Sequence, residues 1–235
     1  MRYERQFLIP EIGSGGQEKL RQSKVLVVGA GGLGSPVLTY LTEAGVGNIT
    51  LVDSDIVTES NLNRQFLYTT SDIGREKALC ATEKLGALNP DVSVSPLKMR
   101  VDKENAGEII LGADVVVDCV DSVETRLIVN AACLKQGIPL VEGGVDGFYG
   151  FVMCIRRESA CLRCVGYCQR NEPKPAPIIG CTAGVIGSLQ ANECIKILLR
   201  IGEPLFSKML TYDGYQNSFD VVLLERNPLC EEYHI

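Results

Sequence analysis

Short apolar runs alternate with amphipathic segments along the first two thirds of the chain. Residues 25–28, 49–52 and 115–117 are rich in valine, leucine and isoleucine, which is typical of strands buried on both faces. Residues 74–88 and 124–136 instead place apolar side chains at helical spacing. This alternation predicts an α/β fold, a Rossmann-like doubly wound sheet that is mostly parallel. Weaker patterns add strands at residues 92–94 and 139–142 and a helix at residues 103–111.

The pattern changes after residue 144. Residues 148–155, 209–212 and 220–224 have strand character, and they predict an antiparallel C-terminal extension of the sheet. Between the first two of these lies a Glu-Pro-Lys-Pro-Ala-Pro segment, which is too proline-rich for a helix or a central strand. It predicts a flexible crossover loop at about residues 168–181. The whole chain, residues 1–235, is expected to form a single domain.

The first strand is followed directly by Gly-Ala-Gly-Gly-Leu-Gly at residues 29–34, where a helix is predicted to begin. Glycines at this spacing allow a tight turn and let backbone N–H groups approach a phosphate at a helix N-terminus. Asp53 ends the second strand, close to the distance at which a carboxylate binds the ribose hydroxyls of a nucleotide. A nucleotide site is therefore predicted. An NAD-dependent oxidoreductase is an alternative function, because such enzymes bind their cofactor at the same kind of turn. That class of enzyme has no evident need for the polar run at residues 55–65.

Composition narrows the possible functions. The 235 residues are 46% hydrophobic and 22% charged, which is ordinary for a soluble globular protein. The formal net charge of −6 argues against nucleic acid as a partner, because such binding needs clustered Lys and Arg. No apolar run approaches membrane-spanning length and no signal-peptide pattern follows the first residues. We therefore expect a cytoplasmic location and no membrane partner.

Ten cysteines in such a chain are expected to be thiols, metal ligands or nucleophiles rather than disulfides. Cys161 and Cys164 form a Cys-x-x-Cys pair, which is half of a zinc knuckle. Five others lie in apolar surroundings and are expected to be small buried hydrophobic residues: Cys80, Cys119, Cys133, Cys154 and Cys194.

Seven signatures in order along the chain resemble the MoeB, ThiF and HesA family of ubiquitin-activating-enzyme-like adenylyltransferases. The likeness extends from Arg2 to Cys230, almost the whole chain. It implies ATP-dependent adenylation of the C-terminal glycine of a small ubiquitin-like protein, a sulfur carrier ending in Gly-Gly, for sulfur transfer in cofactor synthesis or tRNA thiolation. The signatures are residues 2–6, the glycine turn, Asp53 with Asp55, residues 60–65, Gly74 with Lys77, residues 118–121 and residues 187–190.

The resemblance also implies roles for charged residues. Adenylation needs the phosphate charge offset and the attacking and leaving groups held in line, which calls for cations and a metal. Arg64 and Lys77 are expected on the phosphates, Asp121 on Mg²⁺ and Asp53 on the ribose. Arg5 is expected to reach the partner's ATP across a homodimer interface, as an arginine finger does. The expected catalytic residues are Arg5, Arg64, Lys77 and Asp121, and the ATP-binding set is Gly29, Gly31, Gly32, Gly34, Asp53, Asn61, Arg64, Gln65, Lys77 and Asp121.

Each of these residues also has a simpler structural interpretation. Arg64 and Lys77 could be solvated surface charges, and Asp121 could cap the helix that begins near residue 123. Arg5 could be an ordinary residue of an N-terminal helix, and Asp55 is expected to be a structural partner rather than a ligand. A non-catalytic binding module of the same fold is a second alternative function, but such a chain should have lost at least one of Asp53, Arg64, Lys77 or Asp121.

Two departures from the family pattern concern cysteines. The family closes its zinc knuckle with a second Cys-x-x-Cys, whereas Tyr233 stands here in place of the last cysteine. The segment before Gly187 is also shorter than in members that transfer their partner to a loop thiol, so Cys181 is expected to be a small residue at a buried helix entry and not an obligatory nucleophile. A structural zinc ion is expected on Cys161, Cys164, Cys230 and His234, with Cys168 as a fallback ligand and a metal-free remnant as the alternative.

Overall fold

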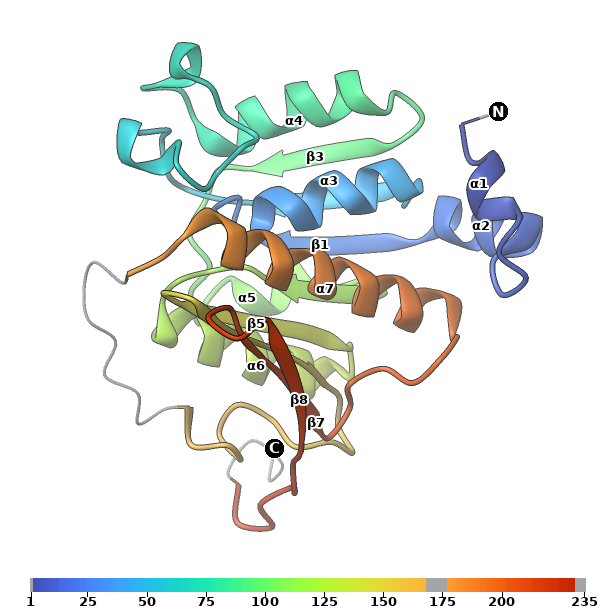
Figure 1. Cartoon of the computed structure of the whole chain (residues 1–235), viewed down its shortest axis with the longest axis vertical. Helices are drawn as coiled ribbons and strands as arrows, with labels where there is room; N and C mark the ends of the chain where they lie inside the picture. Colours follow the sequence, from blue (N-terminus) through green and yellow to red (C-terminus); the bar gives the residue numbers. More distant parts are fainter. Residues whose placement is uncertain (1, 168–176, 231–235) are drawn as a thin grey trace.

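The computed structural model describes residues 2–167 and 177–230, and the strands of this part form one sheet in the order β3-β2-β1-β4-β5-β6-β7-β8 (Figure 1). Pairing is parallel from β3 through to β5 and antiparallel from β5 to β8. The predicted doubly wound sheet with an antiparallel C-terminal extension is confirmed. The strands are β1 (Lys24–Val28), β2 (Asn48–Val52), β3 (Ser93–Leu97), β4 (Val115–Asp118), β5 (Leu140–Asp146), β6 (Tyr149–Ile155), β7 (Lys208–Asp213) and β8 (Ser218–Leu223).

Helices cover both faces of the parallel part, with α3 and α7 on one face and α5 and α6 on the other (Figure 1). No helix in the described part of the chain is long and apolar enough to cross a membrane. The helices are α1 (Glu4–Phe7), α2 (Gly13–Gln22), α3 (Gly34–Ala44), α4 (Lys77–Leu88), α5 (Ala106–Ile110), α6 (Val123–Gln136) and α7 (Gly180–Leu199), with short 3-10 turns η1 (Glu59–Asn61) and η2 (Thr70–Asp72).

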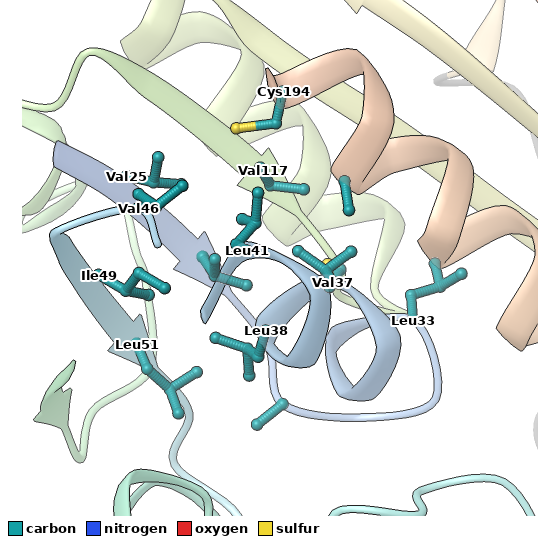
Figure 2. Close-up of a cluster of buried hydrophobic side chains, with 14 of the residues drawn as sticks. Val25, Leu33, Val37, Leu38, Leu41, Val46, Ile49, Leu51, Val117 and Cys194 are labelled. Atoms are coloured by element: carbon teal, nitrogen blue, oxygen red, sulfur yellow. The ribbon is translucent and has the colours of Figure 1, made fainter. Parts of the chain in front are cut away.

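The main core lies between the sheet and α3 (Figure 2). Val37, Leu38 and Leu41 of α3 are fully buried, at the i, i+1 and i+4 positions that form one face of a helix. They pack against the buried faces of β1 and β2, and Cys194 of α7 closes the cluster. The five cysteines expected in apolar surroundings are all buried, as predicted.

A close crossing of α3 and α7 fixes the position of α7. A Cβ atom at Gly187 would lie 2.4 Å from Cγ of Pro36 and 2.6 Å from the carbonyl oxygen of Leu33. Only glycine therefore allows this approach. The consequence for the site is that the first turn of α7 lies beside the glycine turn, where a Cβ at Gly32 would lie 3.4 Å from the Cβ of Ala183.

Element boundaries differ from the sequence predictions where side chains cap the backbone. The helix expected at residues 103–111 is only α5, because Asp102 and Asn105 bond each other's backbone N–H groups just before it. Helix α7 begins at Gly180, so the crossover loop predicted to end at about residue 181 ends earlier. Most of that loop lies outside the described residues.

Candidate functional site

The carboxyl ends of β1, β2, β3 and β4 open into one pocket of about 240 Å³. In an open α/β sheet this edge is where ligands bind, because the strand order reverses beside β1. The pocket is lined by Val28, Gly29, Val52, Asp53, Ser54, Asp55, Met99, Arg100, Val101, Cys119, Val120, Asp121, Ser122 and Thr125.

The glycine turn combines two tightly packed positions with two open ones. Gly29 has a φ of +98°, and a Cβ there would lie 2.8 Å from the carbonyl oxygen of Cys119. A Cβ at Gly34 would lie 2.2 Å from the carbonyl oxygen of Gly29. A Cβ added at Gly31 would lie 3.6 Å from its nearest neighbour, and one at Gly32 would lie 3.4 Å away. Both distances are ordinary van der Waals contacts, so packing within the protein does not require glycine at either position. These two positions leave bare backbone that a phosphate can approach.

Asp53 joins the end of β2 to this turn. Its Oδ2 accepts a hydrogen bond from the backbone N–H of Ala30 at 2.7 Å, and its Oδ1 accepts one from the N–H of Asp55 at 2.8 Å. Burial raises the pKa of Asp53, and the two backbone N–H groups oppose this shift. The carboxyl group is therefore held at one place in the pocket wall, where its remaining lone pairs can accept ribose hydroxyls.

Lys77 is a buried lysine at the start of α4. It is only 5% exposed, so the interpretation of Lys77 as a solvated surface charge is wrong. Its Nζ lies 2.9 Å from Oδ2 of Asp55, and its backbone N–H donates to the carbonyl oxygen of Asp55 at 3.0 Å. Asp55 is thus a structural partner, as expected. Because the Asp55 side chain is 67% exposed, it can become hydrated if the ammonium group moves to a phosphate.

Arg64 lies beside the open part of the glycine turn. Its stem is 3.5 Å from the Cβ position of Gly32, and its Nη1 donates to the carbonyl oxygen of Ser60 at 2.8 Å and to Oδ1 of Asn63 at 2.9 Å. These partners are neutral groups of its own loop. The loop therefore orients the guanidinium, and no carboxylate among residues 2–167 and 177–230 neutralises it.

The two predicted amide contacts differ in exposure. Gln65 is buried below Gly31, and its Oε1 has no hydrogen-bond partner among the described residues. Asn61 is half-buried, and its Oδ1 accepts from the N–H of Thr58 at 3.1 Å. The Asn61 oxygen therefore closes a capping box around η1, which leaves its NH₂ group as the part that could face a ligand.

Asp121 is exposed at the pocket wall, directly beyond β4. Ser122 caps α6 instead, since its Oγ accepts from the N–H of Thr125 at 3.4 Å, so the interpretation of Asp121 as the cap is wrong. Within the described ranges the Asp121 carboxylate makes no hydrogen bond or ion pair. A free carboxylate in a pocket with two further acidic residues suits Mg²⁺, which prefers oxygen ligands.

Arg5 is exposed on α1, at the opposite edge of the sheet from this pocket (Figure 1). Helix α1 is attached near the strand beginnings: Gln6 Nε2 donates to the carbonyl oxygen of Ala44 at 3.1 Å, and Asn89 Nδ2 donates to Tyr3 Oη at 2.8 Å. The five residues of β1 span roughly 16 Å between the two edges. Arg5 and the pocket of the same subunit are thus not brought together.

Three of the four predicted zinc ligands meet in space. The Sγ atoms of Cys161 and Cys164 are 3.8 Å apart, those of Cys161 and Cys230 are 3.7 Å apart, and all three lie within 4.8 Å of one another. The N–H of Asn227 donates to Cys164 Sγ at 3.4 Å. A tetrahedral site with Zn–S bonds of about 2.3 Å separates its sulfurs by about 3.8 Å, so the cluster fits zinc. His234 and Cys168 lie outside the described residues.

Cys181 differs from expectation. It is exposed at the second residue of α7, so the predicted burial at the helix entry is wrong. The apolar neighbours in the sequence misled the prediction, because Thr182 and Ala183 turn inward while Cys181 points away from the core.

The same edge of the sheet also carries residues that the sequence analysis missed. Met99, Arg100 and Val101 line the pocket because they follow β3, and the rule that ligands bind at strand carboxyl ends could have identified them. Tyr68 Oη donates to the carbonyl oxygen of Ala30 at 2.9 Å and so supports the glycine turn from below. No sequence signal indicates that contact.

The fold and this pocket define a nucleotide-binding protein of the doubly wound α/β class. Comparison with known proteins makes this assignment specific. The chain matches the ThiF family over residues 3–232, and it belongs to that family.

Curated relatives match almost the whole chain. It is 44% identical to a sulfur carrier protein adenylyltransferase of Thermus thermophilus, covering 97% of this chain and 89% of that protein. It is 41% identical to the SAMP-activating enzyme E1 of Haloferax volcanii, covering 97% and 87%. The ThiS adenylyltransferase of Escherichia coli is 40% identical, covering 98% and 93%.

Solved structures support the fold. The crystal structure of E. coli MccB with ATP superposes with a TM-score of 0.87 at 24% identity, covering 99% of this chain and 73% of that one. At this identity the likeness concerns the arrangement of helices and strands.

Proposed function

We propose that this chain is an ATP-dependent adenylyltransferase that transfers AMP to the C-terminal glycine of a small ubiquitin-like sulfur-carrier protein. The observation that supports it best is the convergence of Asp53, Asp121 and the open glycines at one sheet edge, with Lys77 and Arg64 beside them. The relatives described above are named for this activity. A non-catalytic module would not be expected to keep all four charged side chains around one pocket.

In the proposed reaction a carboxylate oxygen of the carrier attacks the α-phosphorus, and the bond to pyrophosphate breaks. Asp53 accepts the ribose hydroxyls, and the N–H groups around Gly31 and Gly32 face the phosphates. Lys77 leaves Asp55 and, with Arg64, offsets the charge that develops on the phosphates. Mg²⁺ bound at Asp121 would supply further positive charge to the leaving pyrophosphate.

A homodimer would complete this site. Arg5 lies at the far edge of its own subunit, so it can serve catalysis only across a subunit interface. Mixing Arg5→Ala with Asp121→Ala subunits should then regenerate activity, because one heterodimer site contains both intact residues. A mixture that stays inactive despite measured subunit exchange would show that Arg5 does not act in trans.

A structural zinc ion would hold the loop of Cys161 and Cys164 against the C-terminal segment that contains Cys230. Zinc bound by three thiolates and one further ligand would stabilise the fold directly, because part of the binding free energy becomes folding free energy. We assign no catalytic step to it.

Exchange of radiolabelled pyrophosphate into ATP tests the proposed activity. Pull-down with the purified chain and ATP, followed by mass identification of small proteins ending in Gly-Gly, supplies the carrier. With that carrier, Lys77→Ala and Asp121→Ala should each slow exchange by about a hundredfold or more, because each removes a charge-stabilising group. Lys19→Ala, at an exposed position of α2, is the matched control and should leave exchange unchanged. Normal exchange in both site variants would disprove the assignment.

A further inference from the structure

A buried charged cluster lies directly behind the pocket wall that carries Asp121. Asp118 of β4 and Glu142 of β5 are register partners on adjacent strands, and both are 0% exposed. Arg126 of α6 is 4% exposed and ion-pairs with Glu142. Its Nη1 also donates to the carbonyl oxygen of Gly143 at 2.6 Å. The three side chains come from three different elements and meet at one point.

The cluster contains two carboxyl groups and one guanidinium. Neither Asp118 Oδ2 nor Glu142 Oε2 has a hydrogen-bond partner among the described residues. The two carboxyl groups interact with each other, and a hydrogen bond between two carboxyl groups requires one proton. Burial, and then the neighbouring Asp118, raises the pKa of Glu142 well above its ordinary value. With Glu142 protonated the cluster is neutral, which removes the cost of a buried unpaired charge. The thiols of Cys119 and Cys133 beside it are also neutral, because burial raises their pKa values.

The cluster holds the backbone of Val120, the residue before Asp121, through hydrogen bonds to its N–H and to its carbonyl oxygen. Oδ1 of Asp118 accepts from the N–H of Val120 at 2.9 Å, and Nη2 of Arg126 donates to the carbonyl oxygen of Val120 at 2.5 Å. Gln190 of α7 donates to the carbonyl oxygen of Asp118 at 2.7 Å. Both backbone hydrogen-bonding groups of Val120, its N–H and its carbonyl oxygen, therefore have their partners in this cluster. The exposed Asp121 carboxylate makes no such bond within the part of the chain that the structure describes, so it depends on this backbone for its position.

We propose that Arg126, together with Asp118 and Glu142, is a positioning group that fixes Asp121 in the geometry needed to bind the metal of Mg·ATP. The proposal rests on the proposed function, since it concerns the same nucleotide. The proposed role gives Arg126 no contact with nucleotide or metal. It acts through the Val120 peptide, as outer groups do when they orient a metal ligand.

Calorimetric titration of the full chain with ATP, in the presence of Mg²⁺ or of EDTA, tests the proposal without a carrier protein. Wild-type protein should bind ATP more tightly with Mg²⁺, and Asp121→Ala should lose this increment. Arg126→Met should weaken Mg²⁺-dependent ATP binding by about 10- to 100-fold and leave binding in EDTA near the wild-type value. Arg126→Met added to Asp121→Ala should cause no further loss. Arg157→Met, at an exposed arginine that donates to carbonyl oxygens near the end of α6, is the matched control.

The outcomes separate the two proposals. If wild-type protein binds ATP no more tightly with Mg²⁺, the proposed function fails, and the positioning role fails with it. If wild-type protein shows the increment, two results would overturn this inference by showing a merely structural role. One is that Arg126→Met weakens ATP binding equally with Mg²⁺ and with EDTA. The other is that Arg126→Met and Asp121→Ala have additive effects on ATP affinity. Arg126→Lys guards against misfolding of the Met variant. Its ammonium cannot reach Val120 and Gly143 as a fork does, so full recovery of the increment with Lys would also overturn the proposal.

Discussion

The crossing of α3 and α7 can be tested with two glycines of one helix. Gly184→Ala adds a methyl group where nothing lies within 4 Å, so it should stabilise the protein by about 0.5–1 kcal/mol through lower unfolded-state entropy and better helix propensity. Gly187→Ala adds the same group 2.4 Å from Pro36 and 2.6 Å from a backbone oxygen. Overpacking of this kind costs about 1–3 kcal/mol, and subtracting the propensity gain leaves a net loss of up to about 2.5 kcal/mol.

Urea unfolding measures both effects, because the midpoint shifts at constant slope when only stability changes. For a chain of this size each kcal/mol moves Tm by about 2–4 °C, so the two variants should move Tm in opposite directions. Gly187→Ala should also weaken ATP binding, since the added methyl group pushes on Leu33 in the glycine turn. Equal stability of the two variants would show that the crossing relaxes freely and that Gly187 does not set the position of α7.

Three further predictions concern the zinc cluster, the exposed thiol and the buried acid. Elemental analysis should find about one zinc per chain, and Cys164→Ser should lower Tm; metal-free protein of unchanged stability would contradict the site. Cys181→Ala should adenylate the carrier and support sulfur transfer normally, and loss of only the transfer product would identify Cys181 as the transfer thiol. Burial raises the pKa of Glu142, so at pH values above its unfolded pKa of about 4.3 the wild-type protein takes up a proton when it folds. The contribution of Glu142 to the free energy of unfolding should therefore fall as pH rises, by at most about 1.4 kcal/mol per pH unit. Glu142→Gln should remove that slope, and parallel stability curves for the two proteins would refute the shared proton.

The glycine turn, Asp53 and Asp121 could be predicted because each follows a strand that the apolar pattern identifies. Once the strands are parallel, their carboxyl ends must meet, and the polar residues beyond them share one edge. Lys77 could not be placed in this way. Its burial depends on the turn at η2 and on the bridge between Ile56 and Glu76, which bring the start of α4 to the pocket. The pattern of apolar strands does not predict either feature.

The positioning cluster behind Asp121 could not be predicted either. Asp118 and Glu142 are far apart in sequence, and the pattern treats each only as the polar end of an apolar run. Their contact follows from the register of β4 against β5, which local hydrophobicity does not determine. The contacts of Arg126 with β5 and with Val120 beyond β4 likewise depend on how α6 packs, so the helical period alone gave no reason to single it out.

The pocket is held chiefly by backbone hydrogen bonds, which has a consequence for its preformation. Asp53 is fixed by the N–H of Ala30, Lys77 by the carbonyl oxygen of Asp55, and the peptide before Asp121 by the buried cluster. None of these contacts requires a nucleotide. The proposed ribose and metal positions therefore exist before ATP binds, which would reduce the ordering cost of binding. In the proposed reaction only two side chains change partners. Lys77 leaves Asp55, Arg64 leaves Ser60 and Asn63, and both carry positive charge toward the phosphates. Reorganisation is thereby confined to the groups that offset charge in the reaction.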